Sequence, residues 1–270
     1  MKRVLIVVAL AIVVQPFRPA ATVVVQPFRA AVTVVVQPFR AAVTPVVQPF
    51  RAVLHAQEQK KIDEFKMTTY QAVFVTKGPK WTDTVSPEAQ PVVAAHREYI
   101  RELLTSRRAL IIGTLTGPST SQLRGVYIVA GTPEQATEIA AADPGVKDGR
   151  WAFEVLKWMG PEGWFQRPSS EEMEKIYFGF LVNGPNRSQD EQTAQKLQRG
   201  HLDYMDGQAK IGKLVLAGPL LDGGTRRGLI AYRVATMEEA SERASGDPMV
   251  KEGRLAVELY EWNIPKGILK

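Results

Sequence analysis

The sequence predicts an α+β protein whose main part consists of two copies of one small βαββαβ domain. The first observation is a repeat in the body of the chain at a spacing of about 105 residues. It is clearest where DPGVKDGRWAFE at 143–154 is matched by DPMVKEGRLAVE at 247–258. The second observation is that each copy has the same order of strand-like and helix-like segments. Further upstream the offset drifts between 104 and 106 residues, as changes of loop length after a duplication would produce.

Each copy begins with a β-rich run that ends at Gly-Pro, which breaks a strand. A helix with apolar residues at helical spacing follows, and then two short strands. A second helix begins at an N-capping threonine, Thr132 or Thr236, and stops at Asp143 or Asp247, each of which precedes a proline. One more strand completes the copy. In chain order, the expected elements are 70–76, 87–106, 109–115, 125–130, 132–143 and 152–158, then 177–182, 190–208, 214–217, 229–234, 236–247 and 256–262.

This order of elements is that of a ferredoxin-like domain, whose antiparallel sheet has helices on one face only. The other face must be covered, and a second copy of the domain can cover it. We therefore expect a domain at 66–160, a linker at 161–171 and a domain at 172–267, paired sheet to sheet as an intramolecular dimeric α/β barrel. The strands should then be apolar on both faces, and either half alone should aggregate or self-dimerise.

The net charge of +6 comes from the first part of the chain. Residues 1–56 contain six of the 34 basic residues and none of the 28 acidic ones, so the remainder has 28 of each. Binding to a phosphate backbone needs a dense basic face, and this balance gives no reason to expect nucleic acid as a partner.

The N-terminal segment 1–56 resembles a secretory signal peptide that has been expanded. Met1-Lys2-Arg3 precedes an apolar run, and Gln-Pro-Phe-Arg then recurs four times with a period of 11 residues. Deleting three such units leaves a leader of ordinary proportions ending at Ala56. We expect cleavage after Ala56 and export to the periplasm or the medium, with no stable membrane anchor. An uncleaved apolar anchor and a misassigned start are the alternatives.

Histidine and aspartate occur at matched positions in the two copies. His96 and His201 lie on the apolar stripe of the first helix, and Asp143 and Asp247 end the second helix, which runs beside it. A carboxylate that accepts from one imidazole nitrogen fixes the tautomer and leaves the other nitrogen for acid or base chemistry. The alternative is structural, with the aspartate only ending a helix at Asp-Pro and the histidine a satisfied, half-buried core residue.

Other candidate residues are weaker. Arg150 and Arg254 are expected to cover the outer face as solvated side chains, with a role in holding an anionic substrate as the alternative. Glu154 and Glu258 are expected to point outward from the last strands, with a role as acids that support the site from behind as the alternative. The sequence has no cysteine, so it has no disulfide, thiolate metal site or cysteine nucleophile. One histidine in each copy is too few for zinc, and we expect no metal and no cofactor.

The histidine on the first helix, the Gly-Pro after the second strand region and the Asp-Pro at the end of the second helix resemble the YciI-like (YCII-related) family. The resemblance covers about 70–160 and again about 175–264. It implies a dimeric α/β barrel and an active-site pair in each copy, His96 with Asp143 and His201 with Asp247. The family usually has an aromatic residue after Asp-Pro, whereas this chain has Gly145 and Met249.

Two functions follow as hypotheses. One is an exported small-molecule enzyme of the lyase, isomerase or hydrolase type that uses the His-Asp pair as acid and base. The other is a non-catalytic barrel that binds a small ligand or serves as a scaffold. Neither hypothesis names a substrate or its binding residues, and an oligomer of the whole chain stays open.

Overall fold

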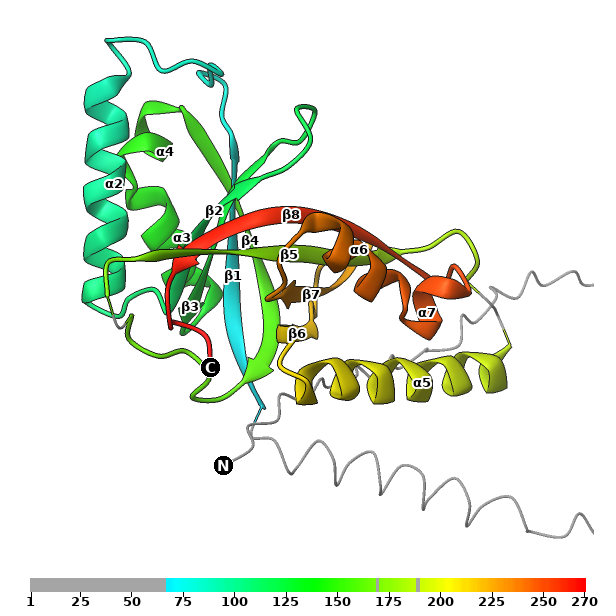
Figure 1. Cartoon of the computed structure of the whole chain (residues 1–270). Helices are drawn as coiled ribbons and strands as arrows, with labels where there is room; N and C mark the ends of the chain where they lie inside the picture. Colours follow the sequence, from blue (N-terminus) through cyan, green and yellow to red (C-terminus); the bar gives the residue numbers. More distant parts are fainter. Residues whose placement is uncertain (1–66, 169, 188–189) are drawn as a thin grey trace, which may run out of the picture. The chain divides into compact units, whose positions relative to one another are not determined.

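The computed structural model describes residues 67–168, 170–187 and 190–270. The expected leader and its cleavage site after Ala56 lie outside these residues. Within them, the chain forms two βαββαβ units, which we call the N-terminal half and the C-terminal half (Figure 1). The predicted order of elements is therefore confirmed in both halves.

The N-terminal half consists of four strands and three helices. Its elements are β1 (Met67–Lys77), α2 (Gln90–Thr105), β2 (Ile111–Thr116), β3 (Leu123–Ala130), α3 (Pro133–Ala142), α4 (Pro144–Asp148) and β4 (Trp151–Pro161). The C-terminal half repeats them as β5 (Met173–Asn183), α5 (Glu191–Lys210), β6 (Leu214–Pro219), β7 (Arg226–Tyr232), α6 (Met237–Ser245), α7 (Pro248–Lys251) and β8 (Leu255–Pro265).

The second helix of each unit starts at the predicted threonine. The Thr132 hydroxyl accepts from the Gln135 amide, and the Thr236 hydroxyl accepts from the Glu239 amide, so each threonine satisfies a backbone donor at its helix start. The prediction missed the short helices α4 and α7, because it treats Asp-Pro only as the end of the preceding helix. The same dipeptide can also begin a helix. Proline suits the first helical position, since the backbone N-H that it lacks would have no partner within the helix there. The first and last strands are also longer than predicted.

The eight strands form one antiparallel sheet in the order β4-β1-β3-β2-β8-β5-β7-β6. The halves join at β2 and β8, where Leu115 lies opposite Trp262. The equivalent contact on the other side is an isolated bridge between Trp158 of β4 and Leu220, the residue after β6, so the sheet is a nearly closed barrel. The predicted intramolecular barrel is confirmed. The halves are joined edge to edge by their strands, and the inner faces of the two half-sheets enclose one core.

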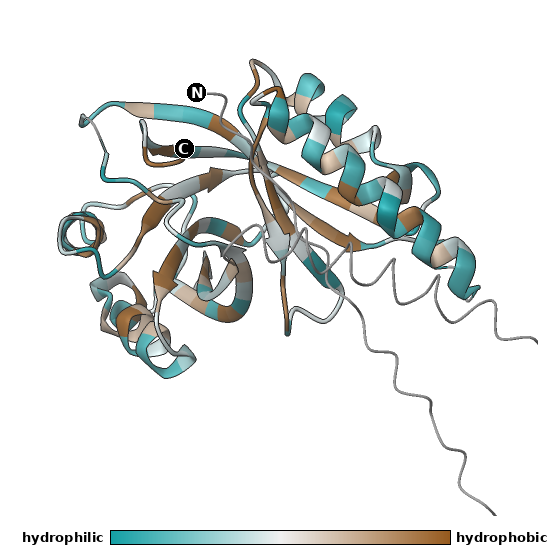
Figure 2. Cartoon of the chain, turned by 90° about the horizontal axis from the view of Figure 1, so that it is seen from below, coloured by the Kyte–Doolittle hydropathy of each residue, from teal (hydrophilic) through white to brown (hydrophobic). Residues whose placement is uncertain are grey.

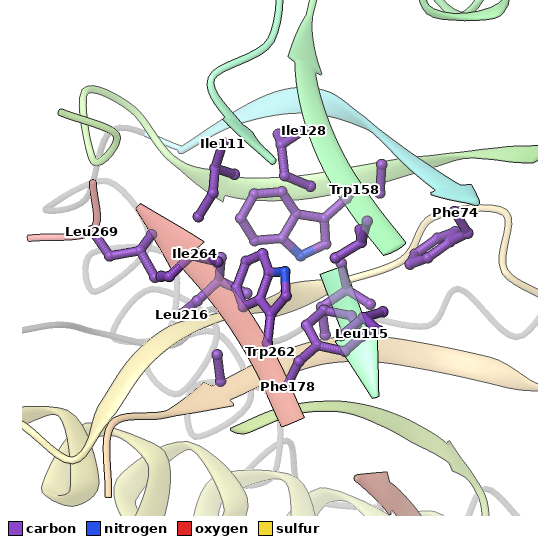
Figure 3. Packing of buried hydrophobic residues seen from close by; sticks show 14 of the residues in the cluster. Phe74, Ile111, Leu115, Ile128, Trp158, Phe178, Leu216, Trp262, Ile264 and Leu269 are labelled. Carbon is purple, nitrogen blue, oxygen red and sulfur yellow. The ribbon is translucent and has the colours of Figure 1, made fainter. Parts of the chain in front are cut away.

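The barrel interior is filled from both halves. Its core cluster contains Phe74 and Trp158 from the N-terminal half and Phe178 and Trp262 from the C-terminal half (Figure 3). Two further clusters fill the space between each half's strands and its own helices. Along β1, Phe74 therefore faces the barrel and Val73 faces the helices. The predicted strands with two apolar faces are confirmed.

The same contact between a tryptophan and a glycine occurs at both places where the halves meet, at β2 with β8 and at β4 with the end of β6. A Cβ atom at Gly113 of β2 would lie 2.1 Å from Nε1 of Trp262, and one at Gly218 of β6 would lie 2.9 Å from Nε1 of Trp158. Each tryptophan thus packs against a glycine of the other half, where any side chain would collide with the indole ring. These contacts tie the stability of each half to the presence of the other.

The helices cover the outside of the strands, three in each half (Figure 1). The visible side of the long helix α5 is largely hydrophilic in Figure 2, whereas hydrophobic residues recur along the strands. The helix residues that face the strands include Leu103 of α2 and Met205 of α5, both buried. The first helix of each half, α2 or α5, therefore packs its inner face against the strands, and the histidine lies on this face.

Candidate functional site

The structure brings His96 and Asp143 together in the N-terminal half. Asp143 ends α3 and also caps α4, where its Oδ1 accepts from the Gly145 amide at 2.8 Å. Its Oδ2 lies 2.7 Å from Nδ1 of His96, which projects from α2. Because the cap fixes the carboxylate, its second oxygen can hold the imidazole in one orientation.

The C-terminal half repeats this arrangement. Asp247 Oδ1 accepts from the Met249 amide at 2.8 Å, and its Oδ2 contacts Nδ1 of His201 from α5. The aspartate side chain is 2% exposed and the histidine 9%, against 5% and 14% in the N-terminal half. The four residues named from the sequence therefore form two equivalent pairs, one in each half.

The geometry also defines the state of the imidazoles. A carboxylate can only accept, so Nδ1 donates and Nε2 is left with its lone pair when the ring is neutral. Within the part of the chain that the structure describes, no hydrogen bond engages Nε2 of either histidine, and neither Nε2 is among the buried atoms without a partner. This is the arrangement that general acid-base chemistry requires.

An aromatic wall lies beside the first pair. The indole of Trp151 stacks on His96 with ring centroids 4.2 Å apart and an angle of 25° between the planes. The absence of a side chain at Gly145 makes this possible, because a Cβ there would lie 1.9 Å from the Trp151 ring. The aromatic residue that the resemblance led us to expect after Asp-Pro is thus supplied by the start of β4. Sequence reasoning missed Trp151, although its place in the repeat opposite Leu255 was visible.

The C-terminal half reverses the sizes of these two residues. Met249 stands where the N-terminal half has Gly145, and Leu255 stands where it has Trp151, and both side chains are buried. A large and a small residue have exchanged places while the His-Asp contact is the same. The residues at these two positions therefore differ in chemistry: an aromatic ring stacks on His96 in one half, and the equivalent positions hold a leucine and a methionine in the other.

Tyrosines lie near each pair, and those on the first helices are at matched positions. The hydroxyl of Tyr99 donates to the Ile139 carbonyl at 2.8 Å, which ties α2 to α3, and Tyr204 makes the equivalent bond to the Arg243 carbonyl. Tyr127 lies on β3 below the first pair. Burial raises its pKa, and the charge of Asp143 adds to the rise.

In the C-terminal half a buried tyrosine lies two residues further along the strand: by the strand registers Tyr232 corresponds to Val129, and Ile230 to Tyr127. Burial raises the pKa of Tyr232, with smaller contributions from Tyr204 and Asp247. The inner side of each pair is therefore lined by a neutral phenol.

The expectation of a solvated Arg150 is wrong. Its side chain lies inside the structure with 3% of the residue exposed, and its Nη1 and Nη2 donate to the hydroxyl and the carbonyl of Thr82 at 3.0 and 3.1 Å. Arg254 is partly buried. The sequence could not show this, because the loop that contains Thr82 and covers Arg150 comes from a distant part of the chain.

Glu154 and Glu258 are exposed, but the expectation that they point outward is wrong for Glu154. Glu154 lies opposite Phe74, on the face of β4 that lines the barrel, and it pairs with Arg226 of the other half at 2.6 Å. These carboxylates therefore lie at an end of the barrel, and Glu154 adds an ion pair between the halves.

Among residues 67–168, 170–187 and 190–270, no group of three or more His, Cys, Asp and Glu side chains is placed to hold a metal ion. No helix in the same ranges is long and apolar enough to cross a membrane.

Several solved structures are similar to this chain at low sequence identity. A mutant of chlorite dismutase from Candidatus Nitrospira defluvii in complex with cyanide has a TM-score of 0.49 and 11% identity, over 76% of this chain and 93% of the other. A heme-binding protein from Thermus thermophilus has a TM-score of 0.45 and 9% identity, over 74% and 93%. No curated protein matches the sequence. Residues 179–263, which include His201 and Asp247, match the family model of the YCII-related domain.

Proposed function

We propose that the chain is a small-molecule enzyme of the lyase, isomerase or hydrolase type, in which His96 and His201 act as general base and acid. The observation that carries the proposal is that the same imidazole nitrogen meets the same carboxylate oxygen in both halves. In both halves the contact leaves Nε2 without a hydrogen-bond partner among the described residues, so this nitrogen can meet a substrate.

In the proposed step, Nε2 takes a proton from the substrate while Nδ1-H stays bonded to the carboxylate. The ring becomes positively charged, and the adjacent carboxylate of Asp143 or Asp247 stabilises that charge in surroundings with little water. The proton then returns from Nε2 to the product, or to the group that leaves. Asp143 and Asp247 are positioning residues in this scheme, because each acts through its histidine.

We also propose that the N-terminal half is a second YCII-related copy, although the family model matches 179–263 alone. The support is structural equivalence between the halves. Both halves have the same strand order and the same His-Asp contact. Both also have a register shift at the same place in the first strand, between Val75 and Thr76 and between Leu181 and Val182.

Variants of the two histidines test the enzymatic proposal. The full chain is incubated with a metabolite extract, and the compounds that are consumed are identified by mass spectrometry. We expect the double substitution His96→Ala with His201→Ala to lower turnover at least about a hundredfold, since general acid-base catalysis contributes about 10²–10⁴ in rate. Each single substitution should remove only the turnover of its own half. The matched control is Glu98→Gln, two positions along α2 from His96 and 71% exposed, which should leave turnover unchanged.

Unchanged turnover in a protein that carries both histidine substitutions would contradict the assignment.

A non-catalytic barrel is the second candidate function, and the burial of the C-terminal pair favours it for that half. Asp247 is 2% exposed and could serve only to fasten α5 to α7. In that case His201→Ala would lower the free energy of unfolding, and the wild-type protein would consume no compound in the extract.

Export is a separate proposal, and it rests on the charged start and apolar run of residues 1–56. N-terminal sequencing of the protein from the periplasm or the medium should give a terminus at Gln57. A mature protein that starts at Met1 would contradict it.

A further inference from the structure

Three cationic side chains surround one indole ring in the N-terminal half. Lys77 Nζ, Arg124 Cζ and Arg150 Cζ lie 5.7, 5.0 and 4.9 Å from the ring centroid of Trp81. We call these four residues the Trp81 cluster. Cation-π contacts make such a grouping tolerable, but they do not neutralise the charge.

Arg150 has the least compensated charge in the cluster. Its guanidinium is buried, and its terminal nitrogens donate to neutral acceptors of Thr82. Its Nε is buried with no partner, and no described carboxylate forms an ion pair with it. A buried charge without an opposite charge is costly to the fold, so an anion that approached it would be bound strongly.

Asp83 supplies one negative charge at the solvent side. It accepts from Trp81 Nε1 at 3.0 Å and pairs with Lys77 at 3.3 Å, and its side chain is 85% exposed. Three positive charges therefore face one negative charge on an exposed loop. Asp83 occupies the position that an external anion would compete for.

The cluster also reaches the His-Asp pair. The Arg150 Cζ lies 5.6 Å from the ring centroid of Trp151, which also stacks on His96. The Trp81 and Trp151 rings meet edge to face at 6.3 Å. One aromatic side chain therefore separates the guanidinium from the imidazole.

The C-terminal half keeps the two arginines at equivalent places. The backbone bond from Gly78 to the Arg150 carbonyl has its counterpart in the bond from Gly184 to the Arg254 carbonyl. By the strand registers, Arg227 corresponds to Arg124.

Position 187, equivalent to Trp81, holds a third arginine in the C-terminal half. Burial lowers the pKa of Arg187, and the charges of Arg254 and Arg227 lower it further. A concentration of arginine at these equivalent positions is thus common to both halves, although the residue at its centre differs.

We propose that the Trp81 cluster binds the carboxylate or phosphate group of the molecule on which His96 acts. A planar guanidinium pairs well with two oxygens of such a group, and Trp81 holds Arg124 and Arg150 on the same ring. The link to turnover rests on the proposed function, whereas the binding of an anion does not.

The test is a titration of the full chain with inorganic phosphate, and separately with succinate, at low ionic strength. Calorimetry and tryptophan fluorescence report binding, and the protein carries Arg227→Gln so that the C-terminal arginines do not obscure the result. We expect saturable binding of at least one of the two anions. The anion that binds identifies the group as phosphate or carboxylate.

Two substitutions should move the affinity in opposite directions. Arg124→Gln should weaken binding at least tenfold, and Asp83→Asn should tighten it a few-fold because it removes the competing charge. Arg101→Gln, on the exposed face of α2, removes the same charge as Arg124→Gln and should have no effect. Arg101 is exposed and Arg124 is partly exposed, so neither substitution should unfold the protein. Thermal melts check that each variant is folded.

No saturable binding of either anion would overturn the proposal, and so would equal weakening by Arg124→Gln and Arg101→Gln. His96→Ala separates this inference from the proposed function, since the variant should keep anion binding while losing the share of turnover that depends on His96. Turnover that depends on His96 in a protein that binds neither anion would leave the enzymatic proposal standing and remove this one.

Discussion

In the N-terminal half the imidazole of His96 lies flat against Trp151, whereas the equivalent position in the C-terminal half holds Leu255. The residue after Asp-Pro changes in the opposite sense, from Gly145 to Met249. Around these differences the bond from histidine Nδ1 to aspartate Oδ2 is the same, and so is the cap that fixes the carboxylate.

The comparison separates what each half requires from what it can vary. The capped aspartate and its histidine depend on backbone geometry that both halves share, so they recur. The wall beside the histidine depends on side-chain volume. Either the residue after Asp-Pro or the first residue of the last strand can be the large one, provided that the other is small. If both pairs act as proposed, the different walls should give the two halves different ligand preferences.

Separating the halves should have the largest effect. Each half contributes about one side of the barrel core, and a half alone would expose that face to water. We expect 67–168 or 170–270, expressed alone, to aggregate or to form dimers that rebuild the barrel. Size-exclusion chromatography with light scattering measures this. A monomeric half as stable to urea as the whole chain would show that the halves do not need each other.

Removing an aspartate should have the next largest effect. Asp247→Ala loses a helix cap, worth about 1 kcal/mol, and leaves a buried imidazole N-H unpaired, which costs about 1–3 kcal/mol. Asp143→Ala should cost less, because its pair is more exposed. Urea denaturation gives the free energies of unfolding. Asp247→Asn serves as the control, since asparagine keeps the cap, and equal losses for Asn and Ala would place the whole effect in the imidazole contact.

Exchanging the walls should have a smaller and partly reversible effect. Gly145→Met forces a side chain into the Trp151 ring, and such overpacking costs about 1–3 kcal/mol. Adding Trp151→Leu gives the N-terminal half the pair of residues found in the C-terminal half, and should recover most of the loss. A double-mutant cycle from unfolding free energies measures the coupling. Simple additivity of the two changes would show that the two positions do not compensate each other.

The smallest effect concerns the tyrosines beneath the pairs. The pKa of Tyr127 and of Tyr232 is raised in the folded protein, so the unfolded chain loses these protons first as the pH rises. The stability they contribute is fully present below the unfolded value near 10 and is lost as the pH rises above it. Tyr127→Phe with Tyr232→Phe should flatten the fall in unfolding free energy above pH 10. An unchanged slope would contradict the assignment.

Much of the architecture could be predicted because it depends on local chemistry and on the repeat. Thr132 and Thr236 mark helix starts, and the apolar residues on both faces of the strands predict a shared core. The histidine and aspartate pairs could be proposed from matched positions. Their contact could not be derived, because it depends on the short helices after Asp-Pro and on how each aspartate divides its two oxygens.

The side chains that surround the His-Asp pairs were harder to predict from the sequence than the pairs themselves. Trp151 and Arg150 lie in the best-matched stretch of the repeat, yet their burial depends on Gly145 and on Thr82, which is 68 residues from Arg150 in the chain. An arginine next to a strand resembles a solvated side chain until the loop that covers it is known.

The tautomer of the two histidines tests the central claim most directly. After removal of residues 1–56, His96 and His201 are the only histidines in the sequence, so their ring nitrogens can be assigned in a ¹⁵N-labelled sample by NMR. At a pH where the rings are neutral, both should carry the proton on Nδ1 and the lone pair on Nε2, and Asp143→Ala should abolish that preference for His96 alone. A proton on Nε2, or an equal mixture of tautomers in the wild-type protein, would contradict the account.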